Sequence, residues 1–327
     1  MKPAAAPDLA QKILRRAALA TRTTANLVAA PFEVLATRGA DNAGTAAGPV
    51  FIIGLPRSGT TLLYQLLATA LDVGYLTNRH CRWYRAPVLA EKMAPSRFGE
   101  CNEFESVFGL TSGPHGPSEC GNYWYRFLPR QPHSLHADAI DGERVRKLRR
   151  AVAALTAAAK RPLIFKNLIL ALRLPVVQRV FPKAVFVVSH RNAVDTGCSI
   201  LMARQKRFGN LQQWFSARPR GCDNASITDD PFEQVATQIV CMDREMRQAR
   251  EAAGDTGFVD VQYAELCSTP RSELERIRRE IAARGIDVGM RENFDCPGEF
   301  AADRSRTSTP AEWRDRIAAA LRTVNQR

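Results

Sequence analysis

The sequence contains no cysteine or histidine pattern typical of a metal site. Its eight cysteines stand at positions 81, 101, 120, 198, 222, 241, 267 and 296, without a Cys-x-x-Cys pair and without a Cys/His cluster of zinc spacing. A structural metal is therefore not expected. Scattered cysteines in a chain of 327 residues are typical of reduced, mostly buried thiols, which favours a cytoplasmic protein, although the even count leaves disulfides open.

Long apolar runs are also absent. No stretch reaches the roughly 18–20 apolar residues of a membrane span. Basic residues recur through residues 1–40, so this segment lacks the continuous apolar core of a signal peptide. It predicts an Ala-rich helix carrying Ile13, Leu14, Leu19, Leu27 and Val28. We expect this helix to pack on the domain; the alternatives are a basic helix lying on anionic lipid, which would make the protein membrane-peripheral, and a helix that binds a partner.

Acidic residues are few compared with basic ones. The 33 acidic and 46 basic side chains leave a formal net charge of +13. This excess predicts an anionic partner: a polyphosphate-like cofactor, a nucleic acid, an acidic glycan or a membrane surface. The helix predicted over residues 141–160 carries six basic residues and would be the surface for nucleic acid, but no nucleic-acid motif accompanies it. We therefore expect no nucleic-acid partner.

Apolar residues make up 45% of the chain, enough for a large core. Buried strands are predicted over 49–55, 162–166, 184–190 and 258–263, and helices over 60–71, 141–160, 172–180, 195–205, 231–252, 271–284 and 311–324. This alternation predicts an α/β fold with a P-loop-like parallel sheet flanked by helices. We expect a basic helical segment and linker over 1–44 and one α/β domain over 45–327. Short helices and loops over 74–132 would cover the carboxyl edge of the sheet, where ligands bind.

One strand–helix connection carries residue types that bind phosphate. It reads Gly54-Leu55-Pro56-Arg57-Ser58-Gly59-Thr60-Thr61. Gly59 lets the backbone approach a ligand closely, and the helix that follows offers free N–H groups and its positive dipole end. Arg57 can add charge. The hydroxyls of Ser58, Thr60 and Thr61 can add hydrogen bonds, so the loop predicts a phosphate site.

The spacing of Gly54 and Gly59 matches the start of a Walker A loop, but Thr60 stands where that motif has its lysine. Without this lysine, a kinase or ATPase loses its hold on the β- and γ-phosphates. The strand predicted over 184–190 also leads into Arg191 rather than into a metal-binding aspartate. We therefore expect the loop to bind one phosphate without a metal ion. The alternative is a P-loop phosphotransferase that uses ATP.

Residues 56–63 resemble the 5′-phosphosulfate loop of sulfotransferases that use 3′-phosphoadenosine-5′-phosphosulfate (PAPS), in particular the bacterial and tyrosylprotein sulfotransferase branches. Residues 184–199 resemble the family's 3′-phosphate motif, with Arg191 at a strand end and Ser199 eight residues later; Ala193 replaces the usual proline. A guanidinium and a hydroxyl at this spacing can converge on one phosphate. The resemblance implies metal-free sulfuryl transfer from PAPS, with adenosine 3′,5′-bisphosphate (PAP) as the product.

The same resemblance assigns further roles. It implies that Tyr263 contacts the 3′-phosphate side of the nucleotide, and that Arg304 and Arg306 belong to a basic loop that closes over the nucleotide. It places Lys166, at the end of the strand over 162–166, near the transferred group, whose charge it would neutralise. The likeness extends over about residues 49–321, and its specific part is the two phosphate motifs.

The general base that takes the acceptor's proton stays open. Many relatives carry a histidine four residues after the lysine, where Leu170 stands here. Others carry a glutamate about twenty residues after the loop, where this chain has no acid but does have His80. Glu119 lies in a segment that resembles a Gly-Pro-Asp-Glu stretch of bacterial relatives. Glu119 and His80 are the two main candidates, and Glu105 is a third.

We therefore predict a sulfotransferase that moves a sulfuryl group from PAPS to a hydroxyl or amine. The basic charge favours a carbohydrate or lipid acceptor over a small phenol. The aromatic residues between positions 83 and 125 suit either stacking on an acceptor ring or a packed lid. A non-catalytic protein that binds nucleotides or polyanions is the alternative from another class, and it would show steep salt dependence.

Overall fold

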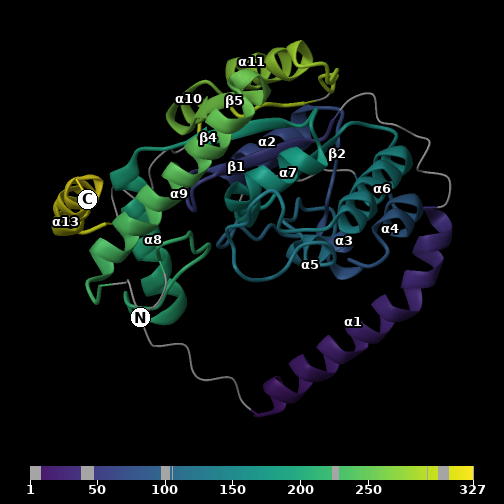
Figure 1. Ribbon diagram of the computed structural model, residues 1–327, viewed down its shortest axis with the longest axis horizontal. Coiled ribbons are helices and arrows are strands. Elements are labelled where there is room, and N and C mark those ends of the chain that lie inside the picture. Colours follow the sequence, from purple (N-terminus) through teal and green to yellow (C-terminus); the bar gives the residue numbers. More distant parts are fainter. Residues whose placement is uncertain are drawn as a thin grey trace.

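A parallel sheet forms the centre of the molecule (Figure 1). The computed structural model describes residues 9–37, 48–96, 104, 106–222, 228–292, 294–300 and 309–326. Within these residues the sheet has five strands in the order β2-β3-β1-β4-β5, and all neighbouring strands are parallel. They are β1 (Val50–Gly54), β2 (Gly74–Tyr75), β3 (Leu163–Lys166), β4 (Val185–His190) and β5 (Phe258–Gln262). The predicted α/β fold is confirmed; the two-residue strand β2 was not predicted, because it is too short to show a pattern.

Helices cover both faces of the sheet (Figure 1). One face packs against α2 (Thr60–Ala70), α10 (Tyr263–Ser268) and α11 (Pro270–Ala283), and the other against α5 (Gly121–Trp124), α6 (Gly142–Ala159) and α7 (Leu174–Val180). A side layer joins α8 (Ala193–Phe208), α9 (Pro231–Ala253) and α13 (Ala311–Asn325). The short helices α3 (Asn78–Arg82) and α4 (Pro87–Met93) follow β2, and 3₁₀ turns span Leu168–Arg173 and Asp255–Gly257.

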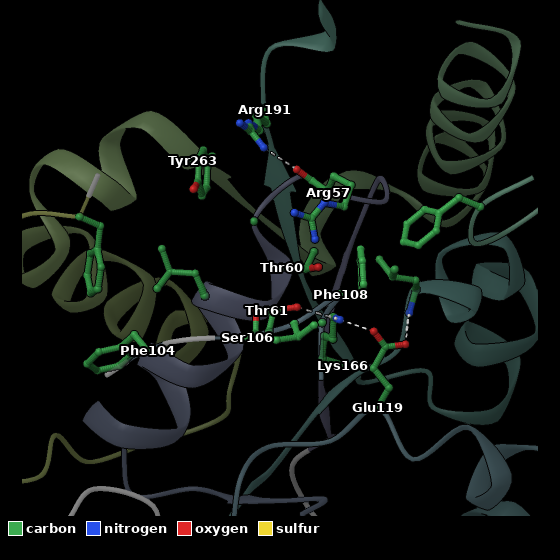
Figure 2. A pocket seen from close by; sticks show the side chains of 17 residues that line it. Arg57, Thr60, Thr61, Phe104, Ser106, Phe108, Glu119, Lys166, Arg191 and Tyr263 are labelled. Carbon is green, nitrogen blue, oxygen red and sulfur yellow. Dashed lines mark hydrogen bonds and ion pairs between the residues drawn. The ribbon is translucent and has the colours of Figure 1, made fainter. Parts of the chain in front are cut away.

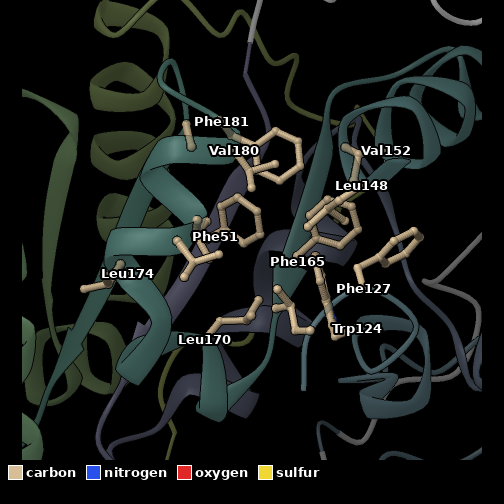
Figure 3. Packing of buried hydrophobic residues seen from close by; sticks show 14 of the residues in the cluster. Phe51, Trp124, Phe127, Leu148, Val152, Phe165, Leu170, Leu174, Val180 and Phe181 are labelled. Carbon is tan, nitrogen blue, oxygen red and sulfur yellow. The ribbon is translucent and has the colours of Figure 1, made fainter. Parts of the chain in front are cut away.

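A row of phenylalanines crosses one face of the sheet in register. Phe165, Phe51, Phe186 and Phe258 are strand neighbours on β3, β1, β4 and β5. Adjacent rings lie 5.1–5.7 Å apart, in the range of favourable aromatic pairs. Trp124 packs edge-on against Phe165 at 5.2 Å, and Phe181, which follows α7, packs against Phe51 at 5.8 Å (Figure 3). This core holds rigid the strand ends from which the site is built.

The N-terminal helix α1 (Leu9–Ala36) contacts the rest of the molecule near α4 and extends away from it (Figure 1). Asn26 bonds the backbone of Arg82 and Arg85, and both carboxylate oxygens of Glu33 accept N–H groups at the start of α4. The predicted apolar packing is wrong for Leu27 and Val28, which are 53% and 63% exposed. Polar anchors hold this helix, and five of its large apolar side chains face solvent: Leu27, Val28, Phe32, Val34 and Leu35. The side chains of Ile13, Leu14 and Leu19 lie outside the described part of the structure.

Two predictions from the sequence concerned a membrane span and the state of the cysteines. None of the helices described is both long enough and apolar enough to cross a bilayer. The seven cysteines in the described ranges are thiols, four of them buried, and Cys101 lies outside these ranges. The division of the chain into residues 1–44 and 45–327 stays a prediction.

Candidate active site

The loop between β1 and α2 turns sharply around Gly59, which precedes the helix with φ +94°. A Cβ atom on Gly59 would lie 2.1 Å from Cδ2 of Tyr263, so glycine is required both by the backbone conformation and by the ring packed on it. Ser189 Oγ donates to the carbonyl oxygen of Ser58 and ties the loop to β4. The loop therefore presents the N-terminus of α2 and the hydroxyls of Thr60 and Thr61 to the cavity.

The two predicted phosphate motifs meet in space. Arg57 Nε donates to Ser199 Oγ at 3.0 Å, and Arg191 Nη1 donates to the carbonyl oxygen of Arg57 at 2.9 Å. The guanidinium of Arg191 also lies over the ring of Tyr263, 4.9 Å from its centroid. This contact is expected from topology, because Arg57 and Arg191 follow the neighbouring parallel strands β1 and β4.

Burial, together with the nearby charge of Arg191, lowers the pKa of Arg57. Two guanidinium groups held this close repel each other, and an anion bound between them would relieve the repulsion. Guanidinium groups pair readily with phosphate oxygens through charge-assisted hydrogen bonds. This part of the cavity is therefore suited to a phosphate.

A second polar group lies at the other end of the cavity (Figure 2). Lys166 Nζ donates to Thr61 Oγ1 at 3.2 Å and forms an ion pair with Glu119. The side chain of Lys166 is 2% exposed and that of Glu119 is 31% exposed, so the lysine is the inner partner and the carboxylate reaches solvent. Asn167 donates to the carbonyl oxygen of Glu119, and the N–H of Leu168 approaches its Oε2 at 3.5 Å. A proton acceptor and a buried cation thus lie next to the phosphate loop.

One cavity of about 410 Å³ joins these groups. Eight of the predicted site residues line it: Arg57, Gly59, Thr60, Thr61, Glu119, Lys166, Arg191 and Tyr263. Ser199 lies behind it as the partner of Arg57. Ser58 does not line it, and its buried hydroxyl has no hydrogen-bond partner among the residues described. Arg304, Arg306 and Glu105 lie outside the described residues.

His80 is placed elsewhere. Its Nδ1 accepts from the backbone N–H of Thr77 in a capping box at the start of α3, and its Nε2 lies 3.3 Å from Glu91 Oε2. Both side chains are buried, at 1% and 3% exposure. Burial opposes ionisation of Glu91, but hydrogen bonds from His80 and Ser96 outweigh it and lower the pKa of the carboxyl. The prediction that His80 lies in the cavity as a candidate base is wrong. Its two ring nitrogens contact Thr77 and Glu91, and the side chain does not line the cavity.

A model of the sulfotransferase family matches residues 49–282, over both phosphate motifs and the sheet between them. The chain belongs to the sulfotransferase family. Two curated relatives, omega-hydroxy-beta-dihydromenaquinone-9 sulfotransferase Stf3 of Mycobacterium bovis and of Mycobacterium tuberculosis, are each 24% identical to this sulfotransferase over 254 residues. The match covers 71% of this chain and 62% of each relative, less than two thirds of their length.

The crystal structure of sulfotransferase STF9 from Mycobacterium avium has the same fold. It superposes with a TM-score of 0.50 at 18% identity, covering 88% of this sulfotransferase and 70% of that chain. The family match over residues 49–282 confirms, at the level of the family, the resemblance stated from the two motifs.

Several residues that line the cavity were not predicted as site residues from the sequence: Leu62, Ser106, Val107, Gly109, Leu168, Phe215 and Phe300. Phe104 and Phe108 also line it, and both belong to the aromatic stretch predicted either to stack on an acceptor ring or to form a packed lid. The aromatic stretch between positions 83 and 125 divides between two roles. Tyr123 and Trp124 belong to the core, whereas Phe104 and Phe108 reach the cavity. The turn at Phe108-Gly109 carried little signal in the sequence, because type I′ hairpin turns favour Asn-Gly or Asp-Gly and not an aromatic residue before the glycine.

Proposed function

We propose that this sulfotransferase uses PAPS as its donor and transfers the sulfuryl group to a hydroxyl or amine. The observation that carries the proposal is the contact between the two phosphate motifs, where Arg57 bonds Ser199 and Arg191 bonds the Arg57 carbonyl. PAPS carries phosphate at two positions, and a site with cationic groups beside a glycine loop fits such a ligand. When bound, PAPS supplies a sulfuryl group whose bond to the 5′-phosphate breaks as the acceptor bonds to sulfur, and PAP remains.

The residues at different positions along the cavity have different proposed roles. Arg191 and Ser199 would hold the 3′-phosphate, with Tyr263 beside them. The N–H groups at the start of α2, with Thr60 and Thr61, would hold the 5′-phosphate end. Phe104 and Phe300 lie in edge-to-face contact at 5.4 Å and pack against the hydrophobic cluster of α2 and α11. Their rings suit an apolar face of the donor's base.

Glu119 is the proposed general base and Lys166 its partner. Glu119 can take the proton from the acceptor because its carboxylate lines the cavity and is partly exposed there. The ion pair with Lys166 holds the carboxylate in place. Lys166 also bonds Thr61, so one ammonium group links the base to the phosphate loop. Its charge would stabilise negative charge that develops on the leaving phosphate.

A ligand-binding measurement separates this proposal from the ATP alternative. We expect PAP to raise the melting temperature equally with and without EDTA, and ATP with Mg²⁺ to have a much smaller effect. Stabilisation at a ligand concentration of 100 Kd is about 2.7 kcal/mol. A rise with ATP that depends on Mg²⁺ would favour a phosphotransferase. Indifference to PAP together with steep salt-dependent binding of polyanions would favour the non-catalytic alternative.

The proposal includes a peripheral contact of α1 with an anionic membrane surface. Five large apolar side chains of this helix are 53–63% exposed: Leu27, Val28, Phe32, Val34 and Leu35. The acidic residue of the helix, Glu33, is buried at the start of α4, whereas the helix sequence carries four basic residues. An apolar stripe on a cationic helix suits a bilayer of anionic lipid, while like charge disfavours pairing of two copies. A cytoplasmic, membrane-peripheral location is proposed on this basis.

The acceptor stays at the level of a hydroxyl or amine in this proposal. The two curated relatives are named for a hydroxylated menaquinone derivative as their acceptor. Of the two alternatives raised by composition, a carbohydrate and a lipid, these names support the lipid.

A further inference from the structure

The reactive end of the cavity is covered by a tight turn. Val107 and Leu110 exchange two backbone hydrogen bonds, each of 3.0 Å, so Phe108 and Gly109 form the tip. Both tip residues have positive φ, 52° and 83°, as a type I′ hairpin turn requires. A Cβ atom on Gly109 would lie 3.4 Å from Thr61 Oγ1 and 3.7 Å from both Lys166 Nζ and Glu119 Oε1. The backbone of the tip therefore lies directly against the groups proposed to act on the acceptor.

The wall of the cavity beside Glu119 is apolar. Phe108 and Phe215 contact each other at 6.1 Å, and Leu168, whose N–H faces Glu119, also lines the cavity. Phe108 and Phe215 pack in the hydrophobic cluster of α8 and α9, on a different side from the cluster that supports Phe104 and Phe300. Figure 2 shows Phe108 near Lys166 and Phe104 away from Glu119. The cavity thus has two apolar walls, and the one next to the base is formed by Phe108, Phe215 and Leu168.

The apolar surface continues from the cavity onto its rim, where Val107 still lines the cavity and Leu110 lies beyond it. Val107 is 61% exposed and Leu110 is 71% exposed, at the base of the same turn whose tip lies on Glu119 and Lys166. Exposed large apolar side chains next to a binding cavity commonly mark a ligand or partner site. The cavity itself, about 410 Å³, lies in the lower part of the roughly 300–1,000 Å³ typical of small-molecule sites. A nucleotide donor would take most of this volume, so a large acceptor must project over the rim.

We infer that the acceptor is an amphipathic alcohol: its hydroxyl reaches Glu119 past Phe108 and Phe215, and its hydrocarbon body lies on the rim formed by Val107 and Leu110. The inference rests on the proposed function, since it assigns the second substrate of the same site. The apolar wall and rim favour a hydrocarbon body, because burying hydrocarbon there is favourable whereas the hydroxyls of a sugar would find few polar partners.

Three alcohols test this assignment: farnesol, prenol, which has the same allylic hydroxyl on a short body, and methyl glucoside, which has a primary hydroxyl on a polar body. With labelled PAPS, farnesol should exceed the other two in kcat/KM by about tenfold or more, because its extra hydrocarbon is bound at the rim. Leu110→Ser should raise KM for farnesol by several-fold and leave KM for PAPS unchanged. Met93→Ser is the matched control, since Met93 is 85% exposed and does not line the cavity.

Variants of the two aromatic walls provide a second test, in which each variant should raise the KM of a different substrate. Phe108→Ala should raise KM for farnesol, whereas Phe104→Ala should raise KM for PAPS, each by about tenfold. Equal or better use of methyl glucoside by protein that binds PAP would overturn the inference and leave the proposed function standing. So would an unchanged KM for farnesol in Leu110→Ser. If no alcohol is turned over, farnesol must still raise the melting temperature of the PAP complex, or the inference fails. Absence of PAP binding would remove the proposed function itself.

Discussion

Replacing Gly59 with alanine tests how the phosphate loop is held against Tyr263. The new Cβ would lie 2.1 Å from Cδ2 of the ring, whereas carbon atoms in contact are about 3.5–4.0 Å apart, so the ring must move by about 1.5 Å. The left-handed φ of +94° adds about 1–2 kcal/mol for a residue other than glycine. Overpacking adds about 1–3 kcal/mol. We therefore expect Gly59→Ala to lower the free energy of unfolding by about 2–5 kcal/mol.

The chain offers a matched control for the strain. Gly285 has φ +83° and nothing within 4 Å of the position of a Cβ, so Gly285→Ala should cost about 1–2 kcal/mol by strain alone. Urea unfolding measures both costs, and calorimetric titration with PAP measures binding. PAP affinity should fall tenfold or more in Gly59→Ala, because displacement of Tyr263 also disturbs the ring under Arg191, and should be unchanged in Gly285→Ala.

A double variant decides whether the ring is the cause. In a Tyr263→Ala background the steric conflict is gone, so Gly59→Ala should cost about 1–2 kcal/mol there, which leaves a coupling energy of about 1–3 kcal/mol between the two sites. A coupling energy near zero would refute the reasoning. It would show that the ring does not restrain the loop.

Three further predictions concern chemistry, acid stability and the membrane. Glu119→Gln should lower kcat about 10²–10⁴-fold while PAP still binds, whereas His80→Ala should mainly lower the melting temperature, since it leaves a buried carboxylate unpaired; similar kcat losses in both would contradict the assignment. The hydrogen-bonded Arg250 lowers the pKa of Asp260 to about 2, below its unfolded value, so its contribution to stability is present above about pH 4 and is lost as pH falls toward 2. Asp260→Asn should therefore flatten the fall in urea-unfolding free energy over that window, by a modest amount because the side chain is 43% exposed, and an unchanged slope would exclude this role. Phe32→Ser should weaken co-sedimentation with phosphatidylglycerol vesicles relative to Met93→Ser, and equal binding of both variants would argue against α1 as the contact.

The residues proposed to hold the donor could be predicted from the sequence to lie together, because they stand at strand ends. Arg57 and Arg191 follow strands and Lys166 is the last residue of one, and in a parallel sheet the carboxyl ends of neighbouring strands share one edge. Local patterns locate the strands, and the sheet then brings the three side chains to one cavity. The order β3-β1-β4 places the two arginines on neighbouring strands and the lysine on the other side of β1.

The residues proposed to act on the acceptor could not be predicted in the same way. Their positions depend on contacts between residues that are far apart in the sequence. Glu119 is placed by a bond from Ser118 N–H to the carbonyl of Leu76, and by Asn167, which follows β3. His80 belongs to α3, and the N–H of Asn78 at the start of this helix bonds the carbonyl of Gly116. The segments that carry the two candidate bases are therefore neighbours in space, yet Glu119 lines the cavity and His80 does not. No periodic pattern in residues 74–132 distinguishes them.

The two apolar walls of the cavity rest on separate hydrophobic clusters, and this has an evolutionary consequence. Phe108 and Phe215 can be exchanged together with neighbours on α8 and α9 without repacking α2, which carries the phosphate loop. Relatives could therefore diversify in what they modify while the phosphate loop and the helix that follows it stay unaltered. In such a lineage, divergence should concentrate on one flank of the cleft and spare the other.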